Sequence, residues 1–267
     1  TQLWTLAVIP NNKYDLNSSY TNFTNMPMTR DYFTHLDQRP AILEKYSNYL
    51  KSFLYFLQND DSVPPLEKEG LSGFGLCADE FTSTQGWPEQ PYLREGRRLI
   101  GQTTITARDL IINREKPDAI AAGSYGMDSK PTIFTYANGE FARDRFVMYR
   151  MPIYDIPLSA MLPKTGPKNL IVSVGISASP SAFGSIRMEP QFIELGQAAG
   201  FAAAIASQGD STFSSNLLPE IKDELAKVGG FTSMTDICFR LDPNVRSFWG
   251  FKKDTCQTRP FGLIIIR

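Results

Sequence analysis

The chain has 267 residues, 42% of them hydrophobic and 12% aromatic, and a net charge of −1. This is the composition of a globular protein with room for one large domain or two smaller ones, and its charge gives no electrostatic reason to expect nucleic acid or an anionic membrane as partner. No apolar run approaches the roughly 20 residues that cross a bilayer. Because the chain begins at Thr1 without a signal peptide, we expect it to be processed or trimmed.

The N-terminal third predicts one strand, one helix and two loops. Residues 3–10 form an apolar strand candidate that fits the middle of a substrate-domain sheet, and the polar residues 11–31 are predicted to be a loop. Residues 39–58 carry apolar side chains at three- and four-residue spacing, which predicts an amphipathic helix with its aromatic stripe in the core. Residues 60–87, rich in Pro, Gly and acidic side chains, are predicted to be a long loop that either covers an active site or is an exposed insertion.

The middle of the chain predicts a helix start and several strands. Thr106 followed by Asp109 three residues later is typical of a helix N-terminus. The small apolar residues 119–125 are predicted to form a strand. Residues 133–136 and 146–149 are predicted to pair as a hairpin around Gly139-Glu140, and residues 154–162 extend towards the next segment.

The chain is organised around residues 169–208. Residues 170–174 are predicted to be a buried strand ended by Gly175, and residues 176–187 a turn-like segment of Ser, Ala, Pro and Gly. A helix is predicted from about Pro190, since proline suits the first helical turn. Its many Gly and Ala residues indicate a face that lies close to another backbone or a flat ligand. A strand, a close-approach loop and a helix N-terminus together predict a site for an anion or an electron-rich oxygen.

Three cysteines and two sequons bear on the cellular compartment. The cysteines, Cys77, Cys238 and Cys256, do not form a metal pattern; Cys238 and Cys256 are spaced for a disulfide, and three buried thiols are the alternative. N-glycosylation sequons begin at Asn17 and Asn22 in the polar stretch. These features favour a secreted or vacuolar glycoprotein. A last helix is predicted over 217–228, with Gly229-Gly230 as its stop, and a tail over 261–265.

Three blocks in order carry a family resemblance. Residues 169–208 resemble the C-terminal flavin-contacting segment of the FAD-dependent oxidoreductase family, in the two-dinucleotide-binding-domain flavoprotein group. Residues 91–110 are similar to the family's Arg-Glu-x-Arg-Arg segment, and residues 118–131 to its Gly-x-Tyr-x-x-Asp segment. The motifs of the first block are Gly175, Ser177-Ala178-Ser179, Gly184-Ser185-Ile186-Arg187 and Gly196-Gln197-Ala198-Ala199-Gly200.

The resemblance implies a cofactor, a fold and a partner. The cofactor is FAD, and the fold class is α/β, with an α+β substrate domain over residues 1–155, the C-terminal part of a Rossmann-like FAD-binding domain over 156–210, and a C-terminal helix and tail over 211–267. A dinucleotide usually needs a strand–GxGxxG–helix unit, which this chain lacks; the glycines at 70, 73 and 75 have the wrong order. We therefore expect a second polypeptide that carries the N-terminal dinucleotide-binding half.

The resemblance also assigns residues. Its cofactor-binding positions fall on Gly175, Ile176, Ser177, Gly184, Ser185, Arg187, Met188, Gln191 and Phe192. Backbone N–H groups of Gln191 and Phe192 are expected to be free to favour electron density on reduced flavin, with Arg187 adding a charge or binding a phosphate. Candidate catalytic residues are Arg94, Glu95, Tyr125 and Lys130, with Asp128 as a further candidate base. An arginine of residues 91–110 would hold a substrate carboxylate or the reduced flavin, although such an arginine-rich block is otherwise a solvated face.

The sequence departs from the family at two histidines. Pro180 and Lys130 stand where many members carry histidine, and His35, the only histidine, lies in an unmatched stretch and reads as a surface residue or a covalent flavin tether. The leading interpretation is oxidation of a small organic substrate by hydride transfer to flavin N5, with oxygen or another molecule as electron acceptor. The alternative is a non-catalytic binding or regulatory subunit with a degenerate flavoprotein fold. A hydrolase has little support, because no G-x-S-x-G elbow is present.

Overall fold

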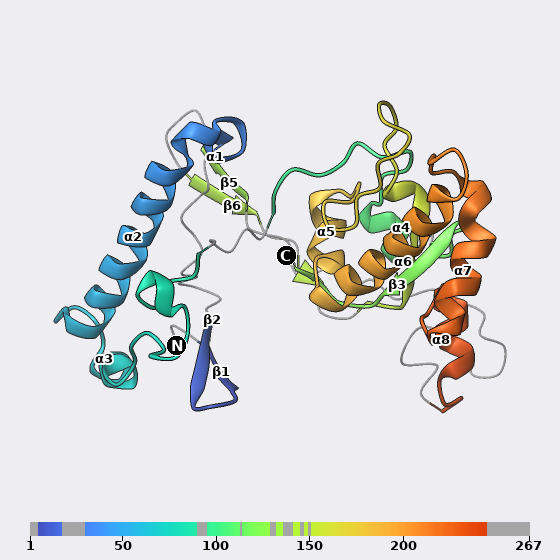
Figure 1. The fold of residues 1–267 in the computed structure, drawn as a ribbon. Helices are drawn as coiled ribbons and strands as arrows, with labels where there is room; N and C mark the ends of the chain where they lie inside the picture. The colour runs from blue at the N-terminus through green and yellow to red at the C-terminus, as the bar shows by residue number, and fades with distance from the viewer. Residues whose placement is uncertain are drawn as a thin grey trace. The chain divides into compact units, whose positions relative to one another are not determined.

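The computed structural model describes residues 5–17, 30–89, 95–112, 114–128, 132–135, 141–144, 147–148 and 151–244. The chain divides into two compact units, Thr1–Gly96 and Arg97–Arg267 (Figure 1). The functional division expected at residues 155 and 210 stays a prediction. Within the described residues, helices and small two-stranded sheets are mixed, which agrees with the predicted α/β class.

The first unit opens with a β-hairpin. Strand β1 (Thr5–Ile9) confirms the predicted strand and pairs antiparallel with β2 (Lys13–Asn17). The loop expected over 11–31 is therefore wrong at β2 and again at helix α1 (Arg30–Thr34). The turn between Ile9 and Lys13 has three residues, and two of them, Asn11 and Asn12, adopt positive φ of 66° and 56°, a conformation that asparagine tolerates better than most residues.

The helices of the first unit follow. A short 3₁₀ turn, η1 (Leu36–Gln38), leads into α2 (Arg39–Asn59), which confirms the predicted amphipathic helix. The aromatic stripe is only partly core, because Tyr46 is buried whereas Tyr49 and Tyr55 are exposed. The long loop expected over 60–87 is wrong at α3 (Pro65–Ser72) and at η2 (Thr82–Thr84). Proline at the start of α3 begins this helix rather than breaking one, and its Leu71 is buried with residues of and after α2.

In the described part of the second unit, the strands form three small antiparallel sheets. Strand β3 (Ala119–Gly123) confirms the predicted strand and pairs with β8 (Tyr154–Pro157). Strand β4 (Met127–Asp128) pairs with β7 (Val147–Met148), and β5 (Thr132–Thr135) pairs with β6 (Phe141–Asp144). The predicted antiparallel pairing is thus confirmed, but the return strand is β6 rather than the expected 146–149, and the predicted turn at Gly139-Glu140 lies outside the described residues.

The helices of the second unit enclose one main core. Helix α4 (Ala107–Ile111) begins at the predicted Thr106, whose side chain exchanges capping bonds with Asp109. The others are α5 (Pro180–Ile186), α6 (Glu189–Ser207), α7 (Leu218–Lys227) and α8 (Met234–Arg240), with η3 (Leu158–Ala160) and η4 (Ser215–Leu217) between elements. The apolar faces of α4 to α7 meet around β3 and β8, in a core that includes Ile120, Ile156 and Leu195, whereas Met234 and Cys238 of α8 pack in a separate cluster. Figure 1 shows α6 running behind β3, with α7 and α8 at one end.

Two expectations for the organising stretch are wrong. Residues 170–174 are irregular rather than a buried strand, and Leu170 and Val174 are exposed. Their backbone is bonded at isolated points, as at Val172 N–H to Met161 O (2.9 Å), and forms no ladder within the described chain. Residues 180–186 are helical rather than turn-like, because Ser179 accepts a capping bond from Ala182 N–H and Pro180 occupies the first turn.

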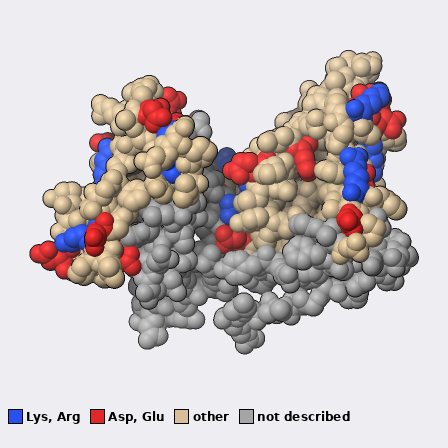
Figure 2. All heavy atoms as spheres, turned by 90° about the horizontal axis from the view of Figure 1, so that it is seen from below, with Lys and Arg blue, Asp and Glu red and all other residues tan. Residues whose placement is uncertain are grey.

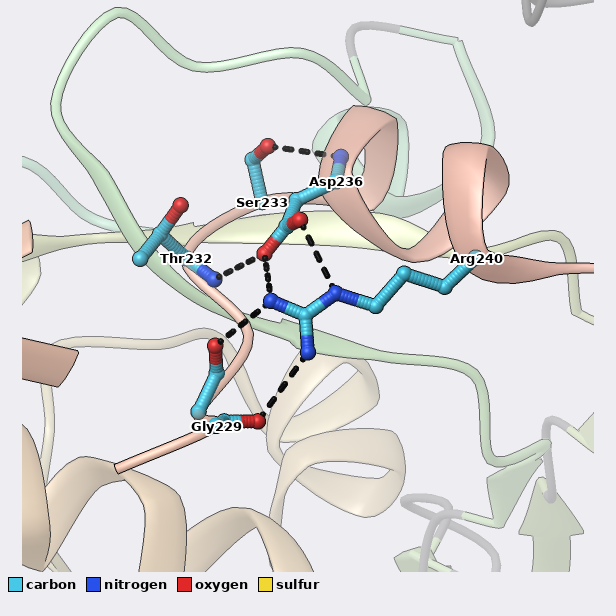
Figure 3. A network of polar contacts seen from close by, with 6 residues as sticks. Gly229, Thr232, Ser233, Asp236 and Arg240 are labelled. Atoms are coloured by element: carbon cyan, nitrogen blue, oxygen red, sulfur yellow. Dashed lines mark hydrogen bonds and ion pairs between the residues drawn. The ribbon is translucent and has the colours of Figure 1, made fainter. Parts of the chain in front are cut away.

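The last two helices are joined by a dense polar network. Helix α7 confirms the predicted helix and is followed by Gly229 with φ of 78°. Figure 3 shows the Arg240 guanidinium between the Asp236 carboxylate (Nε to Oδ1, 3.2 Å) and the carbonyl of Gly229 (3.1 Å). Ser233 caps α8 by accepting from Asp236 N–H. These contacts fix the turn before α8, a helix that the sequence did not predict.

Helix α8 is also held by a hydrogen bond from its first residue to strand β8 and by a disulfide. The buried Asp155 carboxylate of β8 accepts from the backbone N–H groups of Met234 and Lys116, the latter at 2.9 Å. Cys238 is buried and disulfide-bonded, whereas Cys77 is a free, exposed thiol. The expected partner Cys256 and the predicted tail at 261–265 lie outside the described residues.

The surface carries no extended region of one charge on the face that Figure 2 displays, where acidic and basic side chains of the described residues are interspersed. Among the described residues, no helix is long and apolar enough to span a bilayer.

Candidate functional site

The predicted flavin-contacting residues 175–177 are hydrogen-bonded to residues 99–105, which follow the arginines of the block 91–110. Leu99 N–H donates to Gly175 O at 2.7 Å, and Ile105 N–H donates to Ser177 O at 3.0 Å. The Ser177 N–H in turn donates to Ala160 O at 2.9 Å. A Cβ added at Gly101 would lie 2.7 Å from Ser177 Cβ, so the two segments touch closely. The structure thus brings the matched blocks 91–110 and 169–208 side by side, and Ile176 and Ser177 are buried where they meet.

All polar groups of Ser177 have hydrogen-bond partners within this contact. Its hydroxyl lies 2.9 Å from Thr104 Oγ1, and both of its backbone groups are paired. Only 1% of Ser177 is exposed. In this structure its polar groups join the two segments to each other.

A second contact joins Tyr125 to helix α5. The Ser185 hydroxyl donates to the backbone carbonyl of Tyr125 and lies 2.6 Å from the Tyr154 hydroxyl. Tyr154 is completely buried, and burial raises the pKa of its phenol above the ordinary value, so it remains protonated. Gly123 leaves room for this ring, since a Cβ there would lie 2.6 Å from the Tyr154 hydroxyl. Ser185 therefore positions the Tyr125 segment, while the Tyr125 ring itself is exposed.

Arg187 follows directly after α5 and faces strand β4. One of its terminal nitrogens lies 3.6 Å from the Asp128 carboxylate, and only 8% of its side chain is exposed. This ion pair connects two predicted site residues that are 59 positions apart. Gly184, one turn earlier, is buried inside α5.

Helix α6 starts at Glu189, as expected near Pro190. Its N-cap is Met188, which makes no side-chain capping bond. The expectation that Phe192 offers a free donor is wrong, because its N–H donates to Met188 O at 3.1 Å. As the fourth helical residue, Phe192 reaches the N-cap carbonyl in the ordinary way.

Two buried oxygen atoms near the start of α6 have no hydrogen-bond donor among the described residues. They are Gln191 Oε1 and Glu194 Oε2, and both are closed off from solvent. The Glu194 carboxylate accepts from Ala122 N–H of β3, but burial dominates and raises its pKa to about 7. Glu194 was not predicted from the sequence, where one acid in a mostly small-residue helix gives no signal.

An arginine of the matched block 91–110 does reach this region, although it is Arg98 and not the candidate catalytic Arg94. The Arg98 guanidinium carbon lies 5.3 Å from the centre of the Phe183 ring of α5, and that ring lies 6.3 Å from the ring of Phe192. Arg94 and Lys130 lie outside the described residues. Glu95 belongs to the first compact unit, as does His35, whose exposed ring lies 3.0 Å from the Thr34 hydroxyl.

The geometry therefore gathers three matched blocks around α5 and the start of α6. The family model for FAD-dependent oxidoreductases matches residues 2–225 of the sequence, which is most of the chain. The chain belongs to the FAD-dependent oxidoreductase family. Comparison with curated proteins and with solved structures gives no match.

The cofactor of this oxidoreductase family is FAD, and the side chains at α6 fit such a group. FAD carries hydroxyl and imide N–H donors, which suit the two donor-less acceptors at Gln191 and Glu194. It also carries phosphates, and becomes anionic on reduction, which suits the cation of Arg187. Among the described residues, no group of three or more His, Cys, Asp or Glu could hold a metal ion.

Proposed function

We propose that this chain is the C-terminal part of a two-chain FAD-dependent oxidoreductase that oxidises a small organic substrate by hydride transfer. The observation that carries the proposal is the family match together with the convergence of its three sequence blocks on α5 and the start of α6. Bound FAD would supply the hydride acceptor at flavin N5.

The residues of this chain would bind and orient. Arg187, with Gln191 nearby on α6, would hold the polar part of the cofactor, and the partial positive charge of the α6 N-terminus would favour a reduced, anionic flavin. Tyr125 lies on a segment fixed by Ser185, so its exposed ring would face substrate in a defined position. Arg98, stacked on Phe183, is the arginine best placed to hold a substrate carboxylate.

The partner would be a polypeptide with the strand–GxGxxG–helix unit that this sequence lacks. Two features of the second unit support such a partner. Leu170 and Val174 form an apolar run without a strand ladder, and glycines 196 and 200 of α6 have nothing within 4 Å of an added Cβ. These surfaces would be covered once the dinucleotide half is in place.

Intact mass and the visible absorption spectrum of the natively purified protein test the proposal. We expect a second polypeptide and absorption near roughly 450 nm, the region of oxidised flavin. Anaerobic addition of candidate substrates should then bleach this band. A single colourless chain of 29.9 kDa would overturn the two-chain flavoenzyme.

The second candidate is a non-catalytic binding or regulatory subunit. Proline at position 180 and lysine at position 130, where many family members carry histidine, favour it. A bound flavin that no substrate bleaches, although dithionite does, would support this alternative over the enzyme.

We also propose a secreted or vacuolar glycoprotein. The disulfide at Cys238 suits an oxidising compartment, and sequons begin at Asn17 and Asn22. Treatment of the native protein with an N-glycosidase should lower its mass, whereas an unchanged mass would contradict the glycosylation.

A further inference from the structure

Two neighbouring acceptors on α6 pose a hydrogen-bonding problem. Gln191 and Glu194 are three residues apart, which places their side chains one above the other on the same helix face. Gln191 Oε1 and Glu194 Oε2 are both buried, and neither has a donor. A buried acceptor without a donor is unfavourable, and two adjacent ones repel each other as well.

We propose that Glu194 and Gln191 form a proton-controlled amide switch. When Glu194 is protonated, its Oε2–H donates to Gln191 Oε1, and the amide NH₂ of Gln191 is directed to the other side as a donor. When Glu194 is ionised, the Gln191 amide turns over, so that its NH₂ donates to the carboxylate and its carbonyl oxygen takes the outer position. The protonated state pairs both oxygens, whereas the ionised state pairs the Glu194 carboxylate and turns the Gln191 oxygen outward as an acceptor. One proton therefore exchanges a donor for an acceptor at the outer position of the Gln191 amide.

The surroundings of Glu194 bring the pKa of its carboxyl, and with it the midpoint of the switch, to about 7. Burial raises its pKa to about 7, and Ala122 N–H, the only other cause, lowers it. Helix α6 packs mainly against β3, η4 and α7, and its Phe192 also lies near Phe183 of α5, a helix without charged residues. Neither β3 nor η4 carries a charged residue, and the charged residues of α7 do not contribute to the shift: Glu220, Lys222, Asp223, Glu224 and Lys227. A buried carboxyl without a counter-charge takes up a proton instead of remaining ionised.

A glutamine amide is suited to this role because its two ends have nearly the same shape. Its orientation is set by its hydrogen-bond partners. The functional consequence rests on the proposed flavin site: a donor at Gln191 favours an electron-rich flavin edge, and an acceptor there disfavours it. The switch itself needs only this chain.

Side-chain amide NMR of the full ¹⁵N-labelled chain tests the switch without any cofactor. The Gln191 NH₂ signals, identified by their loss in Gln191→Met, should move with pH along a one-proton curve with its midpoint near pH 7. Glu194→Gln should abolish this movement, because a neutral amide replaces the titrating group. Glu189→Gln removes an exposed acid from the same helix and should leave the curve unchanged. Gln191 signals that stay constant in the wild-type chain, or that titrate equally in Glu194→Gln, would overturn the proposal.

Thermal unfolding between pH 5 and pH 8 gives an independent measurement. The pKa of Glu194 is raised in the folded chain from 4.5 to about 7, so between these values the folded state binds more protons than the unfolded state. Its contribution is therefore present at low pH and lost as pH rises through 7. The melting temperature of wild type should fall relative to that of Glu194→Gln over this range, and parallel curves would contradict the titration. Because neither measurement uses flavin, failure of the switch and failure of the flavoenzyme proposal are distinguishable.

Discussion

At the scale of single residues, Asp155 connects three parts of the second unit. Its carboxylate accepts from Met234 N–H of α8 and from Lys116 N–H, while its own N–H donates to Arg114 O. Burial raises the pKa of Asp155 to about 6, and the two backbone donors lower it. The carboxylate is therefore retained inside the protein by these two hydrogen bonds.

Asp155→Asn should destabilise the chain by about 1–3 kcal/mol, because an amide has one acceptor oxygen and leaves one buried N–H unpaired. Urea unfolding monitored by circular dichroism measures the loss. The control is Asp223→Asn on α7, an exposed acid whose replacement should change stability by less than about 0.5 kcal/mol. Equal stability of Asp155→Asn and wild type would show that Asp155 does not hold α8 in place.

The same scale shows what the sequence could not reveal about the site. Motif positions predict Ser185, Arg187 and Gln191 as cofactor-binding residues, because they stand at fixed spacings within one matched block, and this assignment stays a prediction. The motif did not show that the hydroxyl of Ser177 pairs with Thr104 and that its backbone groups pair with other backbone groups. It also missed Glu194, whose significance comes from burial and from the distant Ala122 N–H. Such features depend on tertiary neighbours, which spacing along the chain does not contain.

At the scale of elements, helices with strong local signals were predicted well. Helix α4 has its Thr-Asp capping box, α7 its terminal glycines, and α2 its apolar spacing. Residues 170–174 look like a strand because their side chains are apolar, but a strand also needs a neighbour to pair with. Helix α5 was missed because its Ser, Ala, Pro and Gly were interpreted as turn residues, although Ser179-Pro180 is also a good helix start.

Two glycines in different elements should respond oppositely to the same substitution. Gly123→Ala in β3 should destabilise the chain by about 1–3 kcal/mol, since the new Cβ would lie 2.6–2.9 Å from atoms of the buried Tyr154 ring. Gly196→Ala in α6 should stabilise it by about 0.5–1 kcal/mol, because nothing lies within 4 Å and alanine favours the helix. Differential scanning calorimetry of both variants checks the two signs. A stable Gly123→Ala variant would mean that Tyr154 can move aside, which its contact with Ser185 argues against.

At the scale of the whole molecule, α6 has a face that the described residues leave uncovered. Ile193 is 72% exposed, and Gly196 and Gly200 follow it at helical spacing with open space beside them. In a monomer an isolated exposed isoleucine needs no explanation. In the proposed two-chain enzyme, this face would lie against the dinucleotide half, and the glycines would allow its backbone to approach closely.

The substitution Gly200→Leu distinguishes a monomer with an exposed α6 face from a two-chain enzyme in which the partner covers that face. The isolated chain should keep or slightly raise its melting temperature, because leucine is a better helix former than glycine and has space here. The two-chain assembly should be weakened, since a leucine side chain would hold the partner away from α6 and expose the flavin to exchange. Flavin retained after gel filtration measures the effect, with Asp223→Leu on α7 as a control that adds the same side chain at another exposed helix position. Equal flavin retention by Gly200→Leu, Asp223→Leu and wild type would place the partner on a different surface. A large loss of stability in the isolated Gly200→Leu chain would instead show that this face is already covered.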